Sequence, residues 1–269
     1  MATRAPRKPP RPAGPLAGAS VIVTRPSGTG AVLRRRVQAL GGNAVGLPGI
    51  SLRVAQDKVR VRKQLRAAQS ADIVIFTSPA AVRFAFALFP RLRLRRATQV
   101  CVPGSGSARA LQRHGVKNAI HPSERRDSEG LLELPLFARL RNRRVALIGA
   151  PGGRDLLPRE LRARGAHVDL VNAYERAKPR LDRRHLRALE IAPTPLVSLF
   201  SSADALTNLH AVLSPALFAH LAAHDGVVSS ARIAEIARTL GFTRVHVAAS
   251  AEPADLLDRA CIVMALHRL

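Results

Sequence analysis

Short apolar runs alternate with stretches whose apolar residues recur at helical spacing, and the alternation continues along most of the chain. Residues 21–24 form a β-branched run that predicts a strand, and Leu33 and Val37 then recur at the spacing of one helix face. Gly41 offers a left-handed C-terminal cap for that helix, and residues 44–47 begin another strand. This order is typical of βαβ units, in which a helix connects two parallel strands.

The same order of elements returns later in the chain. Residues 144–148 predict a strand, Leu157 and Leu161 lie one helical turn apart, Gly165 ends the helix, and residues 167–171 are again extended. Three other segments, in which a strand passes through a small or hydroxylated turn into a helix, also have a counterpart. The matching pairs are 73–86 with 196–209, 100–115 with 226–241 and 121–134 with 248–260.

Read in order, these segments indicate an internal duplication with a repeat far longer than that of a solenoid. We therefore expect the α/β class, with two similar flavodoxin-like domains. Each would be a parallel sheet with helices on both faces, because crossovers with short loops place the helices there. The pattern leaves the strand order open.

The composition fits a soluble protein with two small domains. The chain has 269 residues, of which 47% are hydrophobic, enough for two cores. No apolar run approaches the roughly 20 residues that span a bilayer, so we expect no membrane segment. Residues 1–17 are basic and Pro-rich without the apolar centre of a signal peptide, and they predict a disordered tail. Cys101 and Cys261 are expected to be buried thiols of a cytoplasmic protein.

The formal net charge of +25 admits a nucleic acid, a membrane surface or an acidic small molecule as partner. GC-rich codons alone would also produce many arginines. Trp is absent, Tyr occurs once, and the basic clusters carry no interleaved aromatic residues on which bases could stack. Binding of single-stranded nucleic acid is therefore disfavoured.

Ligands of open parallel sheets bind beyond the carboxyl ends of the strands, where this chain places small and hydroxylated residues before its helices. Unpaired N–H groups at several helix starts facing one cleft would hold an array of carboxylates. The alternative is that each Ser or Thr is an N-cap worth about 1 kcal/mol. The candidate binding residues in these turns are Arg25, Thr77, Ser78, Gly104, Ser105, Gly152, Ser201, Ser202 and Ser230.

Motifs for other chemistries are missing from the sequence. The stretches around Gly104 and Gly152 do not fit G-x-G-x-x-G or a P-loop, the histidines lack metal-ligand spacing, and no nucleophile elbow occurs. We expect neither a cofactor nor a metal. Tyr174, the only tyrosine, follows a strand, and its phenol is protonated at neutral pH and able to donate a proton. Alternatively, its ring packs against a domain edge.

Four segments together resemble uroporphyrinogen-III synthases, namely 21–52, 72–86, 127–134 and 146–177, and the resemblance extends from about Ser20 to Ala260. It implies that residues 18–48 and 178–269 form one domain and 49–177 the other. Extended crossings at 47–53 and 171–179 would join them. It also implies a cofactor-free lyase of tetrapyrrole (heme) biosynthesis, which we expect to be a monomer.

The implied reaction cyclises hydroxymethylbilane, a linear tetrapyrrole with an acetate and a propionate on every pyrrole. The enzyme expels the terminal hydroxyl, inverts the last pyrrole through a spiro intermediate and releases uroporphyrinogen III. Because the substrate closes alone to the unrotated isomer, the protein must above all control geometry.

The resemblance also implies roles for individual residues. Tyr174 matches a tyrosine proposed to assist departure of the hydroxide. Ser230 and Arg232 stand where the sequence departs from a Gly-Pro-x-Thr pattern, and Arg232 could instead bind a substrate carboxylate. The residues matching turns that line the cleft are Thr77, Ser78, Ser128, Gly130, Ser201 and Ser202.

Two other classes of function remain open on the sequence. The charge would suit a non-catalytic polyanion or nucleic-acid binding protein, whose affinity would fall steeply with salt. Two similar α/β domains would also suit a hinged solute-binding module, although an export signal is missing.

Overall fold

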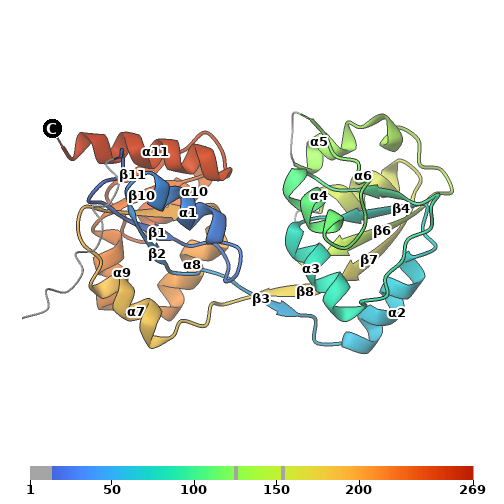
Figure 1. Cartoon of the computed structure of the whole chain (residues 1–269), viewed down its shortest axis with the longest axis horizontal. Helices are drawn as coiled ribbons and strands as arrows, with labels where there is room; N and C mark the ends of the chain where they lie inside the picture. Colours follow the sequence, from blue (N-terminus) through green and yellow to red (C-terminus); the bar gives the residue numbers. More distant parts are fainter. Residues whose placement is uncertain (1–13, 124–126, 153–154, 269) are drawn as a thin grey trace, which may run out of the picture. The chain divides into compact units, whose positions relative to one another are not determined.

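The computed structural model describes residues 14–123, 127–152 and 155–268, and all structural statements concern these residues. They divide into two compact units. Unit 1 contains the described residues up to Ser51 together with those from Ala177 onwards, and unit 2 contains Leu52–Arg176. Figure 1 shows the first strands and helix of the chain, in blue, in the same unit as its orange and red carboxyl-terminal part.

Unit 1 is a five-stranded parallel sheet in the order β11-β10-β9-β1-β2. Its strands are β1 (Ser20–Val23), β2 (Asn43–Gly46), β9 (Leu196–Phe200), β10 (Asp225–Val228) and β11 (Val245–Val247). Its helices are α1 (Ala31–Ala39), α7 (Arg183–Glu190), α8 (Ala203–Val212), α9 (Pro215–Ala222), α10 (Ala231–Thr239) and α11 (Pro253–Leu266). Counted within the unit, the strand order is 2-1-3-4-5, the flavodoxin-like order.

Unit 2 repeats this arrangement with a parallel sheet in the order β5-β4-β6-β7. Its strands are β4 (Ile73–Phe76), β5 (Gln99–Cys101), β6 (Arg144–Gly149) and β7 (His167–Asn172). An isolated parallel bridge from Cys101 to Ile120 extends the sheet where β11 extends that of unit 1. The helices are α2 (Lys58–Ala68), α3 (Pro79–Leu88), α4 (Ser105–Gln112), α5 (Ser128–Leu132), the 3₁₀ helix η1 (Pro135–Phe137) and α6 (Leu156–Ala163).

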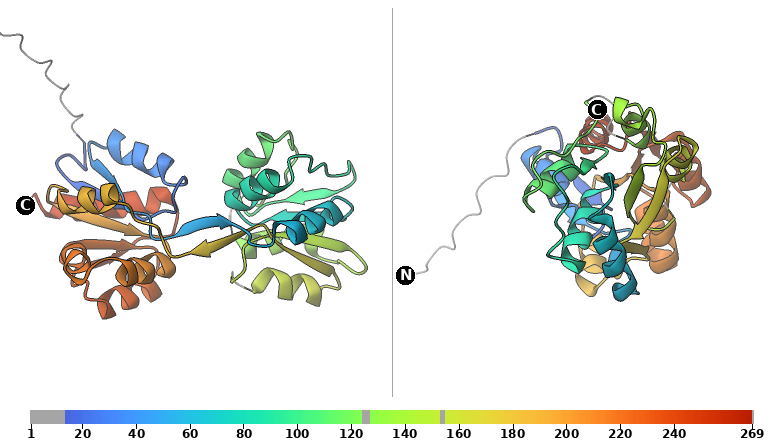
Figure 2. Two further views of the ribbon diagram at one scale, coloured as in Figure 1. Left: turned by 90° about the horizontal axis from the view of Figure 1, so that it is seen from below. Right: turned by 90° about the vertical axis from the view of Figure 1, so that its right-hand side faces the viewer.

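Helices cover both faces of each sheet, as Figures 1 and 2 show. In unit 1, Ile22 faces a core with α7 to α10, whereas its neighbours Val21 and Val23 face one with α1 and α11. In unit 2, Val74 packs with α2, α3 and α4, and Ile75 packs with α5, η1 and α6. The alternation follows from the two-residue period of a strand. The predicted α/β class with two similar, helix-covered parallel sheets is confirmed.

Glycines end several helices as predicted. Gly41, Gly165 and Gly241 follow α1, α6 and α10 at φ values of 85°, 91° and 100°. Residues with a Cβ rarely adopt this left-handed conformation, whereas glycine does so without steric cost. The same local signal therefore closes the helices in both halves of the duplication.

The unit boundaries differ from the expected 48/49 and 177/178. Residues 49–51 belong to unit 1 because the Gly49 N–H donates to the Thr24 carbonyl and its Cα lies against Ala205. Ala177 also joins unit 1. The two expected extended crossings contain β3 (Ser51–Val54) and β8 (Tyr174–Ala177), which pair as a two-stranded sheet.

The expected disordered tail of residues 1–17 falls mostly outside the described residues, but its last part is wrong. Leu16 is fully buried in the core beneath α1, and its N–H donates to the Leu40 carbonyl. The Arg268 guanidinium also donates to the carbonyls of Pro15 and Ala17. The ordered fold therefore begins before Gly18. Within the part of the chain that the structure describes, no helix is both long and apolar enough for a membrane crossing.

Candidate functional site

In unit 2, the strongest candidate site lies where β4 passes into α3. Ser78 is the N-cap of α3, and its hydroxyl accepts the Ala81 N–H at 3.0 Å. The Thr77 hydroxyl donates to the Ile148 carbonyl at 3.2 Å, while a Cβ on Gly149 would lie 2.7 Å from that hydroxyl. Thr77 therefore fastens the carboxyl ends of β4 and β6 to each other, and Ser78 caps a helix.

Tyr174 brings a second hydroxyl to this place. Its oxygen lies 3.1 Å from the Ser78 hydroxyl, and its ring stacks on Phe84 with centroids 5.2 Å apart and an interplanar angle of 12°. The side chain is 3% exposed and belongs to the core of unit 2. The ring therefore packs within unit 2, as the alternative to a catalytic role requires. Its hydroxyl nevertheless contacts the predicted site residue Ser78 at the carboxyl end of β4.

Three more predicted residues stand at the same edge of the unit 2 sheet. Gly104 is the N-cap of α4 and supplies no capping side chain, and Ser105 is the first residue of that helix. Gly152 lies beyond β6 with a φ of 72°, a conformation that favours glycine. Its neighbour Gly153, part of the same predicted turn, lies outside the described residues. The strand order β5-β4-β6 makes these turns neighbours of Ser78.

The helix start at Ser128 differs from the prediction in its chemistry. The N-cap of α5 is Asp127, whose carboxylate accepts the Gly130 N–H at 2.7 Å. Gly130 is buried and Ser128 is half-buried. Since the chain's own carboxylate occupies that donor, this helix start is a poorer place for a carboxylate ligand than the others.

Unit 1 brings its predicted residues to the carboxyl ends of three adjacent strands, β1, β9 and β10. Ser201 follows β9, and Ser202 and Ser230 are the N-caps of α8 and α10 with extended backbones. Neither N-cap side chain makes a capping hydrogen bond. Arg232, in the first turn of α10, is exposed.

Arg25 lies at this edge of the unit 1 sheet, just beyond β1. Its guanidinium donates to the Ala251 carbonyl at 2.6 Å, beside the start of α11. Burial lowers the pKa of Arg25 from its usual value, and the nearby Glu252 carboxylate acts in the opposite direction. The guanidinium has further N–H groups beyond this bond.

Ser202 and Ser230 do not cap their helices, which weighs against the alternative that each serine in these turns is only an N-cap. Elsewhere in unit 1, Ser214 caps α9 by accepting the Leu217 N–H, and Asp182 forms a capping box at α7. These two helices do not directly follow a strand of the sheet. Ser202 and Ser230 do follow strands, and neither hydroxyl caps its helix. Such helix starts favour anions.

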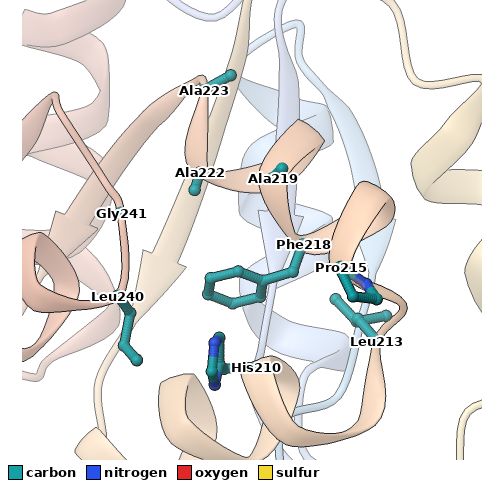
Figure 3. A pocket seen from close by; sticks show the side chains of 9 residues that line it. All are labelled: His210, Leu213, Pro215, Phe218, Ala219, Ala222, Ala223, Leu240 and Gly241. Carbon is teal, nitrogen blue, oxygen red and sulfur yellow. The ribbon is translucent and has the colours of Figure 1, made fainter.

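A separate pocket of about 470 Å³ lies at the opposite edge of the unit 1 sheet (Figure 3). The carboxyl ends of α8 and α10 line it together with α9, and Phe218 meets the His210 ring at its edge, 4.8 Å between centroids. Apart from that imidazole the lining side chains are apolar. Such a pocket does not suit an array of carboxylates.

Sequence reasoning missed three residues with specific contacts: Phe84, which stacks on Tyr174, Asp127, the N-cap of α5, and Asp225 at the amino end of β10, away from these turns. Asp225 is 2% exposed, and its carboxylate binds His246 and His267 at 2.8 Å each and Arg244 at 3.3 Å. An Asp directly before an expected helix start was a readable cap signal for Asp127. Among the described residues, no group of three or more His, Cys, Asp or Glu is arranged to hold a metal ion.

The comparisons with known proteins agree with one another. The family model described as uroporphyrinogen-III synthase HemD matches residues 31–258. The chain belongs to the uroporphyrinogen-III synthase family. It is 31% identical over 247 residues to the uroporphyrinogen-III synthase of Salmonella typhimurium (strain LT2), covering 88% of this chain and 98% of that protein. The Escherichia coli (strain K12) uroporphyrinogen-III synthase is 29% identical over 241 residues, with the same coverage of both chains.

Solved structures show the fold of this family. Uroporphyrinogen-III synthetase from Helicobacter pylori 26695 has a TM-score of 0.58 at 14% identity, covering 91% of this chain and 99% of its own. A mutant uroporphyrinogen III synthase from the extremely thermophilic bacterium Thermus thermophilus has a TM-score of 0.53 at 20% identity, covering 93% of this chain and 100% of its own. Membership of the synthase family does not support the alternative of a non-catalytic polyanion-binding protein.

Proposed function

We propose that the chain is a uroporphyrinogen-III synthase, a lyase that closes hydroxymethylbilane into uroporphyrinogen III with inversion of the terminal pyrrole and loss of water. The observation that carries the proposal is the hydroxyl pair of Ser78 and Tyr174 at the carboxyl end of β4, in a chain of this family. The pair places a hydroxyl that can donate a proton at the carboxyl end of a parallel strand, where ligands of open sheets bind.

Substrate carboxylates are bound by the helix starts of each unit. The N–H groups and hydroxyls come from Ser202 and Ser230 in unit 1, which do not cap their helices, and from the glycine turn at Gly104 in unit 2. Arg25 and Arg232 add positive charge. Holding both ends of a flexible chain in one conformation lowers the barrier by up to about 7 to 11 kcal/mol in favourable systems. Such binding is enough to favour one ring closure over the spontaneous one.

Tyr174 supplies the proton. The C–O bond of the terminal hydroxymethyl group breaks, its electron pair leaves with the oxygen, and the phenol proton converts that oxygen to water. The remaining carbon centre is attacked by the substituted carbon of the last pyrrole, and a spiro intermediate rearranges. The proton that the new ring loses at the end returns to the phenolate, so the enzyme is regenerated without a cofactor.

The two units serve as the two domains of this enzyme, and we propose that it works as a monomer in the cytoplasm. Its free thiols, Cys101 and Cys261, are consistent with a reducing compartment. Sedimentation of the purified chain measures the assembly state, and a dimer at assay concentrations would contradict the monomer.

A product assay tests the function. The purified chain is incubated with hydroxymethylbilane, and the products are oxidised and separated by isomer. The type III isomer at a rate above that of buffer supports the proposal. Type I alone, at the spontaneous rate, would falsify it.

A further inference from the structure

We infer that Ser78 is a positioning residue that donates its hydroxyl proton to the Tyr174 oxygen and so keeps the phenol proton free for the substrate. The inference rests on the proposed function. It concerns the direction of one hydrogen bond. The two oxygens lie 3.1 Å apart, and by distance alone either hydroxyl could be the donor.

The hydrogen-bond capacity of Ser78 supports this direction. A hydroxyl has one proton and two lone pairs, and the Ala81 N–H occupies one lone pair at 3.0 Å. That N–H belongs to the first turn of the ten-residue helix α3, whose amino end carries partial positive charge. A hydroxyl that already accepts there is a poorer second acceptor and a better donor. Ser78 therefore donates to Tyr174.

The surroundings of Tyr174 fix the rest of the geometry. Its ring lies against Phe84 at an interplanar angle of 12°, and the Arg83 guanidinium covers the Phe84 ring with its carbon 4.7 Å from the centroid. With the ring held in place, the phenol O–H can change its direction only by rotation about the C–O bond. If its oxygen accepts from Ser78, its proton points away from Ser78.

The consequence for the reaction concerns charge. When the phenol gives its proton to the departing hydroxide, the phenolate that remains already accepts a hydrogen bond from Ser78. Through that bond the positive end of α3 stabilises the new negative charge. Ser78 itself does not need to touch the substrate.

Two substitutions separate this role from helix capping. Ser78→Asp preserves the cap, because Asp is as good an N-cap as Ser, but an ionised carboxylate can only accept. The phenol must then donate into it, and its proton is withheld. Ser78→Thr keeps both the cap and the donor. Ser214→Ala removes a cap from α9 without involving Tyr174 and serves as the matched control for capping.

We expect kcat of Ser78→Asp and Ser78→Ala to fall about tenfold to a hundredfold, the effect of one hydrogen bond to a developing charge, with little change in KM. Ser78→Thr restores most of the loss seen in Ser78→Ala, and Ser214→Ala keeps the wild-type kcat. A Ser78→Asp enzyme with wild-type kcat, or a change confined to KM, overturns the inference.

A spectroscopic measurement tests the direction without any reaction. Tyr174 is the only tyrosine and the chain has no Trp, so the tyrosine bands of the Raman spectrum come from this phenol alone. The tyrosine Fermi doublet distinguishes a phenol that accepts from one that donates. We expect an acceptor signature in the wild type and a strong donor signature in Ser78→Asp. A donor signature in the wild type contradicts the inference.

The outcomes distinguish this inference from the proposed function. A wild type that forms no type III isomer contradicts the function itself, whatever the Raman doublet shows. An active wild type with a donor signature, or with an unaffected Ser78→Asp variant, contradicts only the role of Ser78.

Discussion

The hydroxyl oxygens of Ser78 and Tyr174 lie 3.1 Å apart although 96 residues separate them in the chain. Ser78 lies two residues beyond β4, a strand in the middle of the unit 2 sheet, and Tyr174 is the first residue of β8, the strand that follows β7. The fold thus joins a helix cap to a phenol whose ring is part of the core. That combination gives the phenol a fixed place and a polar neighbour.

Tyr174→Phe tests the phenol as the proton donor. The ring keeps its stacking on Phe84, and Ser78 keeps its bond to Ala81, so we expect the free energy of unfolding to fall by less than about 1.5 kcal/mol. We expect kcat to fall about a hundredfold, the lower range for a general acid. Single-turnover kinetics and urea unfolding measure the two effects. Unchanged turnover would return Tyr174 to a packing role.

Ser202→Ala and Ser230→Ala test whether these two serines, which do not cap their helices, bind substrate. Because neither side chain caps its helix, we expect each change to alter the free energy of unfolding by less than about 0.5 kcal/mol while KM rises. The control is Ser214→Ala, which removes a real cap and should cost about 1 kcal/mol with normal KM. The opposite pattern, stability loss with normal KM, would show that these serines are only caps.

Asp225→Asn tests the buried carboxylate at the amino end of β10. Burial alone would raise the pKa of Asp225, but hydrogen bonds from His246 and His267 and the Arg244 charge hold it below its usual value. A depressed folded pKa stabilises the protein above the unfolded pKa of about 3.9, and this contribution is lost as pH falls through the folded pKa. We expect Asp225→Asn to cost about 2 kcal/mol at neutral pH.

Urea unfolding between neutral pH and pH 3 measures this contribution. The difference between the wild type and Asp225→Asn should shrink as the solution is acidified. His224, whose pKa burial lowers, faces the same cluster and adds its own loss of stability on acidification to both proteins. The control is Asp169→Asn, which breaks an exposed pair with Arg144 and should cost less than about 1 kcal/mol. A difference that stays constant with pH would contradict the account.

Gly49→Ala tests the close approach that assigns residues 49–51 to unit 1. The new Cβ would lie 2.6 Å from the Cβ and carbonyl oxygen of Ala205, so backbone must shift. We expect a loss of about 1 to 3 kcal/mol in the free energy of unfolding, the range for overpacking. Gly106→Ala is the control, because its Cβ would make an ordinary 3.6 Å contact with Pro79. Equal stability of the two variants would refute the close packing.

Thiol labelling tests the environments of the two cysteines. Burial raises the pKa of Cys101 to about 12, and it also raises the pKa of the half-buried Cys261, with help from Asp258. Thiolate is the reactive form, so both native thiols should label slowly at pH 8, and Cys101 the slower. A Cys261→Ser variant isolates Cys101. Rapid labelling of that variant under native conditions would show that the core of unit 2 opens.

Local signals in the sequence account for most of the predicted fold. Gly41 and Gly165 end helices because the left-handed conformation is a property of single residues. Strand order could not be predicted, since the pairing of β1 with both β2 and β9 depends on contacts across the chain. The duplicated turns nevertheless placed Ser78 and Ser202 at strand ends.

The failures also have physical causes. Leu16 was missed because one apolar residue in a basic, Pro-rich stretch carries no periodicity, yet it fills a core position. The resemblance implied that Ser128 lines the cleft, and the structure adds that the preceding Asp127 is the N-cap of its helix. The stacking of Phe84 on Tyr174 joins α3 to β8 and has no signal in either segment alone.

The isomer ratio under enzyme excess tests the central claim most directly. With hydroxymethylbilane fully bound before it can cyclise in solution, the wild-type chain should give the type III isomer almost alone, and faster than buffer. A mixture dominated by type I, formed at the rate of the unassisted reaction, would contradict the claim that this protein controls how the tetrapyrrole closes.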